Sequence, residues 1–274
     1  MLQTKLILPS AHLRSLVHHY WVMKADRISM EMNIIPTGCM KWMFHRGVPF
    51  VVNGIDNASH VATICGQYNR GVFVRTKNYS DLIFVFFRPY ALKAILGIPC
   101  DLFMEDNIDM DSVSIPEMHD LKRMVLDAPD NATAIGIIEK FISRRLADCY
   151  DALTLKRMTA VCDIIDSNPN VGVSALSDAA CLSERQFRRI FIENVGMTPK
   201  QMIRTKRMYY ATKLIQNLDE CDLSDIVDRL GFTDHSHFNK EFKIFAGMSP
   251  TNYLAHIKAI KSSNFLGGYK AYHE

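Results

Sequence analysis

The pattern of apolar and polar residues changes after the first hundred positions. Before that point, short apolar runs alternate with turn-forming segments such as Pro36-Thr37-Gly38 and Asn53-Gly54. The runs predict six strands, over residues 17–23, 40–45, 50–52, 61–65, 72–75 and 82–87. Short strands at regular spacing are typical of an all-β sandwich or barrel.

After Pro89, the apolar residues recur at helical spacing. We predict a helix over 90–96, ending at Gly97, and a longer one over 132–146, with Asn131 or Thr133 near its start. The longer helix carries a stripe of apolar residues at Ile135, Ile138, Phe141, Ile142 and Leu146. Such a stripe either covers one face of the β domain or forms a subunit interface, and the spacing leaves both open.

No strand pattern follows residue 155, so the remainder is expected to be all-helical. The predicted fold class is therefore α+β in two domains, a β-rich barrel with flanking helices over 1–150 and an all-α domain over 151–261. The seam is expected at 148–155. Residues 262–274 contain Gly267-Gly268 and no periodicity, which predicts a flexible tail.

Composition and charge exclude several classes of protein. The 274 residues are 48% hydrophobic and 22% charged, as in globular rather than disordered or collagen-like chains. The longest apolar run, 82–87, is far shorter than the roughly 20 residues of a membrane span. No signal-peptide pattern opens the chain, and the seven cysteines lack zinc-finger spacing. We expect a cytoplasmic protein with reduced thiols and no membrane partner, and the net charge of +3 lies entirely in residues 152–274.

An internal repeat occupies the helical half. An offset of 51 residues aligns 196–199 (Gly-Met-Thr-Pro) with 247–250 (Gly-Met-Ser-Pro). The same offset aligns three pairs of apolar positions: Leu176 with Val227, Phe187 with Phe238, and Phe191 with Phe242. The second half therefore contains two copies of one helical unit.

Each copy has the pattern of a helix-turn-helix. In the first, a short helix over 173–180 precedes Ser183, which begins the next helix, and Gln186 completes a capping box. In the second, a helix over 223–230 ends at Gly231, and Asp234 is placed to cap a helix over 235–245.

The exposed faces of these second helices suit DNA. Arginine matches guanine edges and asparagine matches adenine. The candidate DNA contacts are Ser183, Arg185, Gln186, Arg188, Arg189, His235, Ser236, His237, Asn239 and Lys240. On charge alone, an ordinary helical bundle with a solvated face is an equal alternative. A linking helix over 199–216 spans about 27 Å, enough with its turns to hold two recognition helices about 34 Å apart, one turn of B-DNA.

These motifs resemble a known family. In the second copy, the residues that carry the resemblance are Gly231-Phe232-Thr233-Asp234, Phe238-Asn239-Lys240 and Gly247-Met248-Ser249-Pro250. In the first copy, they are Leu182-Ser183, Phe187 and Thr198-Pro199. Together they are similar to the tandem helix-turn-helix domain of AraC/XylS bacterial transcription regulators. Asp228 and Arg229 depart from it, because the family favours small or apolar residues there. The resemblance covers about 155–256. It implies recognition of double-stranded promoter DNA, with RNA polymerase as a partner if the protein activates.

The front half resembles the β-rich regulatory domain found in some of these regulators. The marks are Tyr20-Trp21, Ile35-Pro36-Thr37-Gly38, Gly66-Gln67 and the run 87–99. The resemblance implies a cupin-like barrel that binds a small-molecule effector or mediates homodimer formation. The candidate effector-pocket residues are Trp21, Trp42, Phe44, Phe73 and Phe84. The alternative is that these rings fill the core, leaving no room for a ligand.

The sequence gives no support for an enzyme. Histidines in the β half, among them His18, His19, His45 and His60, are scattered, and no phosphate-binding loop or nucleophile elbow occurs. We expect no catalytic residue, metal or cofactor. Two hypotheses remain, a DNA-binding transcription regulator controlled by its front domain, and an interaction protein that keeps the fold but acts by pairing with another regulator.

Overall fold

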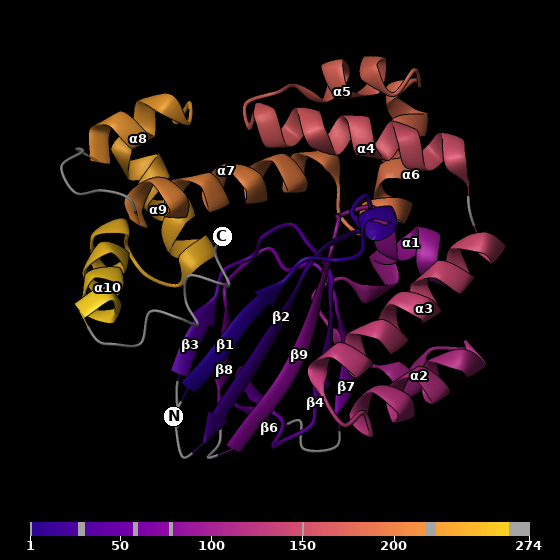
Figure 1. Cartoon of the computed structure of the whole chain (residues 1–274). Helices are drawn as coiled ribbons and strands as arrows, with labels where there is room; N and C mark the ends of the chain where they lie inside the picture. The colour runs from indigo at the N-terminus through magenta and orange to yellow at the C-terminus, as the bar shows by residue number, and fades with distance from the viewer. Residues whose placement is uncertain are drawn as a thin grey trace.

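Two antiparallel β-sheets form the front half of the protein (Figure 1). The computed structural model describes residues 2–26, 31–56, 60–76, 79–149, 151–216 and 223–262. The larger sheet has the order β1 (Leu2–Ile7), β2 (Val17–Asp26), β9 (Tyr79–Phe87), β4 (Lys41–His45), β7 (Ala62–Cys65) and β10 (Asn107–Asp109). The smaller has the order β3 (Glu31–Ile34), β8 (Val72–Arg75), β5 (Val51–Val52) and β6 (Ile55–Asp56).

The expectation of a closed barrel is wrong for the described residues, whose strands form two open sheets. All six expected strands are present within a few residues of their predicted bounds. Four further strands, β1, β3, β6 and β10, were not expected. The shortest of them lack an apolar run, and β10 exists because its three residues pair with Thr63–Cys65. Cross-strand pairing, rather than local pattern, creates such strands.

Both faces of the larger sheet are buried. Along β9, Ile83, Val85 and Phe87 belong to one core cluster, and the alternate residues Leu82, Phe84 and Phe86 belong to another. The second cluster includes Val72 and Val74 of the smaller sheet, so that sheet covers this face. A strand buried on both sides has a continuous apolar run, which explains the pattern at 82–87.

Helices cover the other face of the larger sheet. They are α1 (Ala91–Leu96), α2 (Pro116–Leu126) and α3 (Asn131–Cys149). The apolar stripe of α3 is buried in the same cluster as Trp42, whose ring lies 5.8 Å from that of Phe141. The stripe therefore packs on the sheet, which is the first of the two alternatives predicted for it.

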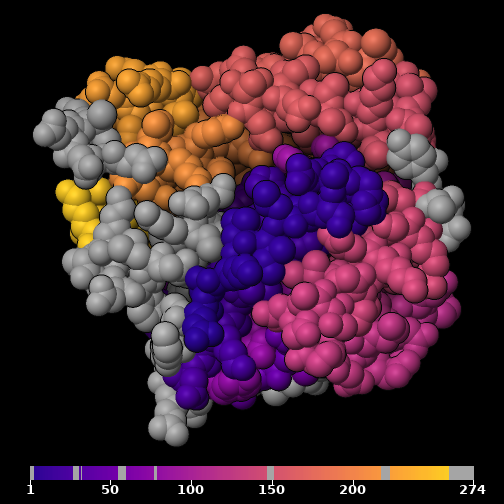
Figure 2. All heavy atoms as spheres, viewed as in Figure 1, coloured from indigo at the N-terminus to yellow at the C-terminus, as the bar shows by residue number. Residues whose placement is uncertain are grey.

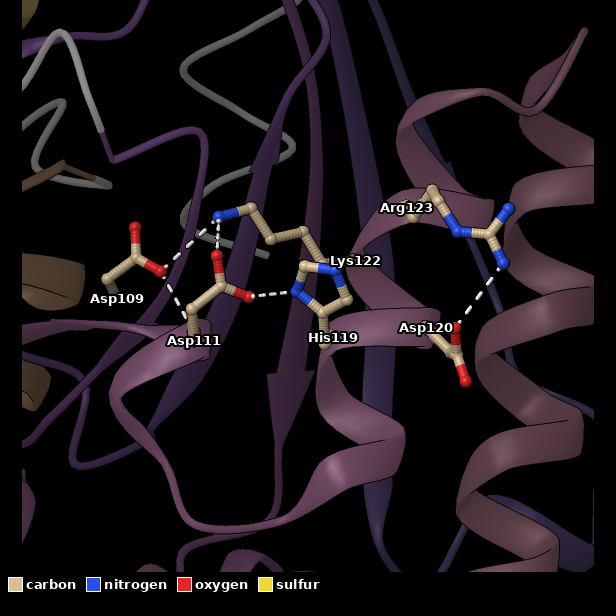
Figure 3. A network of polar contacts seen from close by, with 6 residues as sticks. All are labelled: Asp109, Asp111, His119, Asp120, Lys122 and Arg123. Carbon is tan, nitrogen blue, oxygen red and sulfur yellow. Dashed lines mark hydrogen bonds and ion pairs between the residues drawn. The ribbon is translucent and has the colours of Figure 1, made fainter.

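The helix α2 was not expected from the sequence, and a polar network fixes its outer side (Figure 3). Lys122 Nζ lies 2.6 Å from Asp111, in the short 3-10 helix Met110–Ser112 before α2, and 3.3 Å from Asp109, at the end of β10. His119 Nδ1 lies 3.0 Å from the other oxygen of Asp111. The hydrogen bond from Lys122 lowers the pKa of Asp111. Because His119 is 72% exposed, we assign this network a structural role at the surface.

The second half is helical throughout its described residues. It contains α4 (Ala152–Ser167), α5 (Val173–Ala179), α6 (Glu184–Val195), α7 (Pro199–Gln216), α8 (Leu223–Arg229), α9 (His235–Ala246) and α10 (Pro250–Ser262). The helices begin inside the expected seam, where the Asp151 side chain accepts a hydrogen bond from the Thr154 N–H and caps α4. The tail expected over 262–274 lies, beyond Ser262, outside the described residues.

The two helix-turn-helix units contact the front half differently. The core of the first, with Leu176 and Phe187, belongs to the same cluster as Leu96 and Cys100. The core of the second is a separate cluster that includes only Ile35 from the described front half. Figure 2 shows the front residues, in indigo, directly against the helices of the second half.

Candidate nucleic-acid interface

The two copies of the sequence repeat have the same geometry at the ends of their second helices, α6 and α9. The N-caps of α6 and α9 are Ser183 and Asp234, 51 residues apart in the chain. Both helices end at a left-handed glycine, Gly196 with φ +87° and Gly247 with φ +71°. Because only glycine adopts such a φ readily, these positions end the two helices at equivalent points.

In the part of each helix-turn-helix unit that precedes its turn, equivalent residues of the two copies lie 50 positions apart rather than 51. The Leu182 N–H donates to the Ser177 carbonyl at 3.1 Å, and the Phe232 N–H donates to the Val227 carbonyl at 3.0 Å. By this register, Leu176 corresponds to Ile226, so its alignment with Val227 is wrong. The second turn contains one extra residue, and a single offset cannot represent an insertion inside a repeat.

The outer face of α6 carries the expected polar residues. Ser183 and Gln186 form the expected capping box, with Ser183 Oγ donating to Gln186 Oε1 at 2.9 Å. Arg185, Arg188 and Arg189 are all exposed. Arg188 pairs with Glu184 at 3.2 Å and Arg189 with Glu193 at 3.0 Å. Exposed pairs of this kind contribute only about 0.3–0.5 kcal/mol, so both guanidinium groups can exchange their partner for a phosphate or a base.

The outer face of α9 carries the second expected set, and His235, Ser236, His237, Asn239 and Lys240 are all exposed. The Asp234 side chain accepts from the His237 N–H at 2.8 Å. The His237 ring lies edge-on to Phe232, with centroids 5.6 Å apart. The His237 side chain thus contacts its own unit, whereas Asn239 and Lys240 lie two and three residues further along the helix.

Buried rings and ion pairs position these two faces. Phe187 and Phe191 are fully buried under α6, as are Phe238 and Phe242 under α9. The linking helix α7 contains 18 residues and is thus about 27 Å long. Arg204 of α7 forms a salt bridge with Glu241 of α9. The departures Asp228 and Arg229 are exposed, so they do not disturb the core of the second unit.

The five aromatic residues proposed for an effector pocket do not come together. Trp21 and Phe84 stack at 5.1 Å and line a cavity of about 70 Å³ between the two sheets. Trp42 and Phe44 lie in the other core cluster, under the helices, and Phe73 is 54% exposed. Alternation along β4 does put Trp42 and Phe44 on one face, but a face covered by helices cannot open into the space between the sheets.

A larger cleft, of about 320 Å³, was missed by the sequence analysis. It lies between the front half and α7. Its residues come from distant segments and share no local pattern, so no signal in the sequence could have found it. Among the described residues, no group of three or more His, Cys, Asp or Glu side chains is arranged to hold a metal ion. No helix in the described parts of the chain is long and apolar enough to cross a membrane.

Comparisons with known proteins match both halves separately. Residues 176–256 match the model of a helix-turn-helix domain, and residues 5–109 match a domain of unknown function, DUF6597. The chain is 35% identical over 145 residues to the probable transcriptional regulator LumQ of Photobacterium leiognathi, covering 51% of this chain and 57% of LumQ. It is 36% identical over 76 residues to the transcriptional activator RhaR of Escherichia coli, covering 28% and 27% of the two chains.

The chain spans about half the length of the first curated relatives that it matches. A crystal structure of ToxT from Vibrio cholerae is similar over 93% of this chain and 98% of ToxT, with 14% identity and a TM-score of 0.44.

Proposed function

We propose that this chain, whose residues 176–256 match a helix-turn-helix domain, is a sequence-specific transcription regulator of the AraC/XylS type that reads two successive major grooves. The observation that carries the proposal is the duplicated unit. Each copy is a capped helix with a buried aromatic face and an exposed polar face, and the two are joined by one continuous helix. The joining helix α7, about 27 Å long, can with its adjoining turns hold the two recognition helices about 34 Å apart, which is one turn of B-DNA.

The roles of the side chains follow from their chemistry. Arg185 and Arg188 suit bidentate contacts to guanine, and Asn239 suits adenine. Lys240 also suits a base edge, whereas Arg189 suits phosphates, which set affinity rather than sequence preference. In this proposal, residues 151–261 are the DNA-binding domain and residues 1–150 the regulatory domain. The proposal includes RNA polymerase as a partner if the protein activates transcription. It also includes the formation of a homodimer and, for a protein that regulates promoters, a location in the cytoplasm.

The cavity between the sheets is a poor effector site as it stands. Its volume of about 70 Å³ is well below the roughly 300–1,000 Å³ of typical small-molecule sites. A ligand beside Trp21 and Phe84 would require neighbouring side chains to move. We therefore do not place the effector there.

Footprinting of the full chain on DNA from its own upstream region tests the proposal. Two protected patches centred about 10 base pairs apart on one face of the duplex are expected. Protection of one groove only would contradict bipartite binding. Absence of any salt-sensitive binding would favour the alternative, a protein that acts by pairing with another regulator.

The variant Arg188→Ala tests sequence readout. It should weaken binding to the protected site by about 1–3 kcal/mol and relax the preference at one base pair. The matched control is Arg144→Ala, which removes an exposed arginine of α3 outside both recognition helices. An equal loss on all sequences would show that Arg188 contacts a phosphate instead of a base.

A further inference from the structure

The front half donates hydrogen bonds to the C-terminal ends of both recognition helices. The last carbonyls of a helix have no partner inside it, so a buried helix end needs donors from elsewhere. Val195 and Ala246 are the last residues of α6 and α9, and they lie 51 positions apart, at equivalent points of the repeat. Both carbonyls accept a hydrogen bond from a side-chain amide of the front half. The same contact therefore occurs twice, once for each unit.

Gln67 makes the contact with the first unit. It lies two residues after β7 and is only 2% exposed. Its Nε2 donates to the Val195 carbonyl at 3.3 Å and to the Gly38 carbonyl at 2.9 Å. On the same helix, the Glu193 carboxylate lies 3.7 Å from Lys93 Nζ of α1. One buried amide and one ion pair thus join α6 to the front half.

Asn33 makes the contact with the second unit. Its Nδ2 donates to the Ala246 carbonyl, and the Gly71 N–H donates to the neighbouring Phe245 carbonyl at 2.7 Å. Asn33 lies in β3, and Gly71 directly precedes β8, the partner strand of β3 in the smaller sheet. Because the core of this unit includes only Ile35 from the described front half, its attachment depends largely on such polar contacts.

We propose that Gln67 and Asn33 are positioning residues, which hold the two recognition helices at one fixed placement relative to each other. Their anchors move together, because the smaller sheet packs on a face of the larger. A pair of helices that is already placed loses less conformational freedom when it binds DNA. The inference rests on the proposed function, and it predicts that the chain prefers one spacing between the two grooves that it reads.

Hydrogen–deuterium exchange of the full chain tests the two contacts without DNA. Gln67→Met and Asn33→Leu remove the donating amides and nearly keep the size of the side chains. We expect the C-terminal turn of α6 to exchange about fivefold faster or more in Gln67→Met, and that of α9 to do so in Asn33→Leu, because each helix end loses a donor.

The control for this measurement is Asn69→Leu, since the Asn69 amide donates to Glu105 within the front half. Asn33 is partly exposed, so its variant keeps the test open if Gln67→Met does not fold. If the folded variants exchange like Asn69→Leu at both helix ends, the proposal is overturned.

Binding to DNA of altered spacing tests the consequence. The probe is the site that footprinting protects in the upstream region, with no insertion or with two base pairs inserted between the two patches. Two base pairs rotate one groove by roughly 70° about the axis of the duplex. The wild-type chain and Asn69→Leu should bind the altered site about tenfold more weakly or worse. Each folded variant at Gln67 or Asn33 should reduce this preference to about threefold or less, by binding the original site more weakly.

The remaining outcomes separate this proposal from the proposed function. If the folded variants keep the wild-type preference, α7 alone fixes the spacing, and the proposal is wrong. Tighter binding of the original site by the variants would show that the front half holds the helices away from their DNA-binding arrangement, which also overturns it. If the wild-type chain binds neither site, the proposed function fails and the spacing preference with it, whereas the exchange measurement still decides whether Gln67 and Asn33 hold the two helices.

Discussion

Replacing Gly196 with alanine tests how the first helix-turn-helix unit is held against the front half. Gly196 ends α6 with φ +87°, and it lies against the short 3-10 helix Cys100–Phe103. A β-carbon built at Gly196 would lie 2.8 Å from the carbonyl oxygen of Cys100. That atom belongs to the backbone, so the contact cannot be relieved by rotating a side chain.

Three effects set the size of the change. The left-handed conformation costs an alanine about 1–2 kcal/mol. Forcing a methyl group against the Cys100 backbone adds about 1–3 kcal/mol. In the opposite direction, alanine reduces the conformational entropy of the unfolded chain, which stabilises the folded protein by about 0.4–1 kcal/mol. Gly196→Ala should therefore lower the free energy of unfolding by about 1–5 kcal/mol.

The chain provides matched controls. Gly247, the equivalent residue of the second unit, has φ +71°, but a β-carbon there would meet the ends of the Asn33 and Phe73 side chains, at 3.1 and 3.2 Å. At Gly54, with φ +81°, nothing lies within 4 Å. Urea unfolding should therefore rank the alanine variants in the order Gly196, Gly247 and Gly54, from the largest loss of stability to the smallest. Equal losses at Gly196 and Gly54 would refute the close backbone contact between the two halves.

Three further predictions concern the front half. Trp42→Ala should lower the free energy of unfolding by about 3–5 kcal/mol, and Phe73→Ala by less than about 1 kcal/mol, because Trp42 is fully buried and Phe73 is 54% exposed. Urea midpoints in the reverse order would contradict the assignment of faces. Gly66→Ala should yield no soluble folded protein on expression, since its β-carbon would lie 1.4 Å from the Phe103 carbonyl oxygen. Burial lowers the pKa of His19 and His45 from 6.5 to about 4. The unfolded chain therefore binds more protons below pH 6.5, and stability should fall between pH 6.5 and 4 by up to roughly 3 kcal/mol per imidazole. Urea midpoints that stay constant over this range would show that the two rings are not buried in the neutral form.

The recognition units were predictable from sequence because their signals are local. A capping box joins Ser183 to Gln186 within one turn, and a left-handed glycine ends each helix. Periodic aromatic residues then define the buried face, and the polar face follows by exclusion. The single error of register in this region, the pairing of Leu176 with Val227, arose because a turn can gain a residue without changing the helices around it.

The front half depended on contacts between distant segments. Alternation along β4 showed that Trp42 and Phe44 share a face, but only the packing of α3 on that face made it a core instead of a pocket wall. The apolar stripe of α3 suited both a sheet and a subunit interface, and its placement on the sheet decided between them. Strand β10 formed only by pairing with β7.

The sequence by itself therefore determined which residues are capped, which face of each recognition helix is buried, and that two such units stand in tandem. Tertiary structure decided that the front sheets are open, which rings surround empty space, and that Arg88 and Lys213 line one cleft although 125 positions separate them in the chain. Hydrogen bonds and side-chain periodicity within one element act over a few residues, so their signals are local in the sequence. The pairing of strands, and the fit of one layer on another, depends on the summed burial of apolar surface across the whole fold.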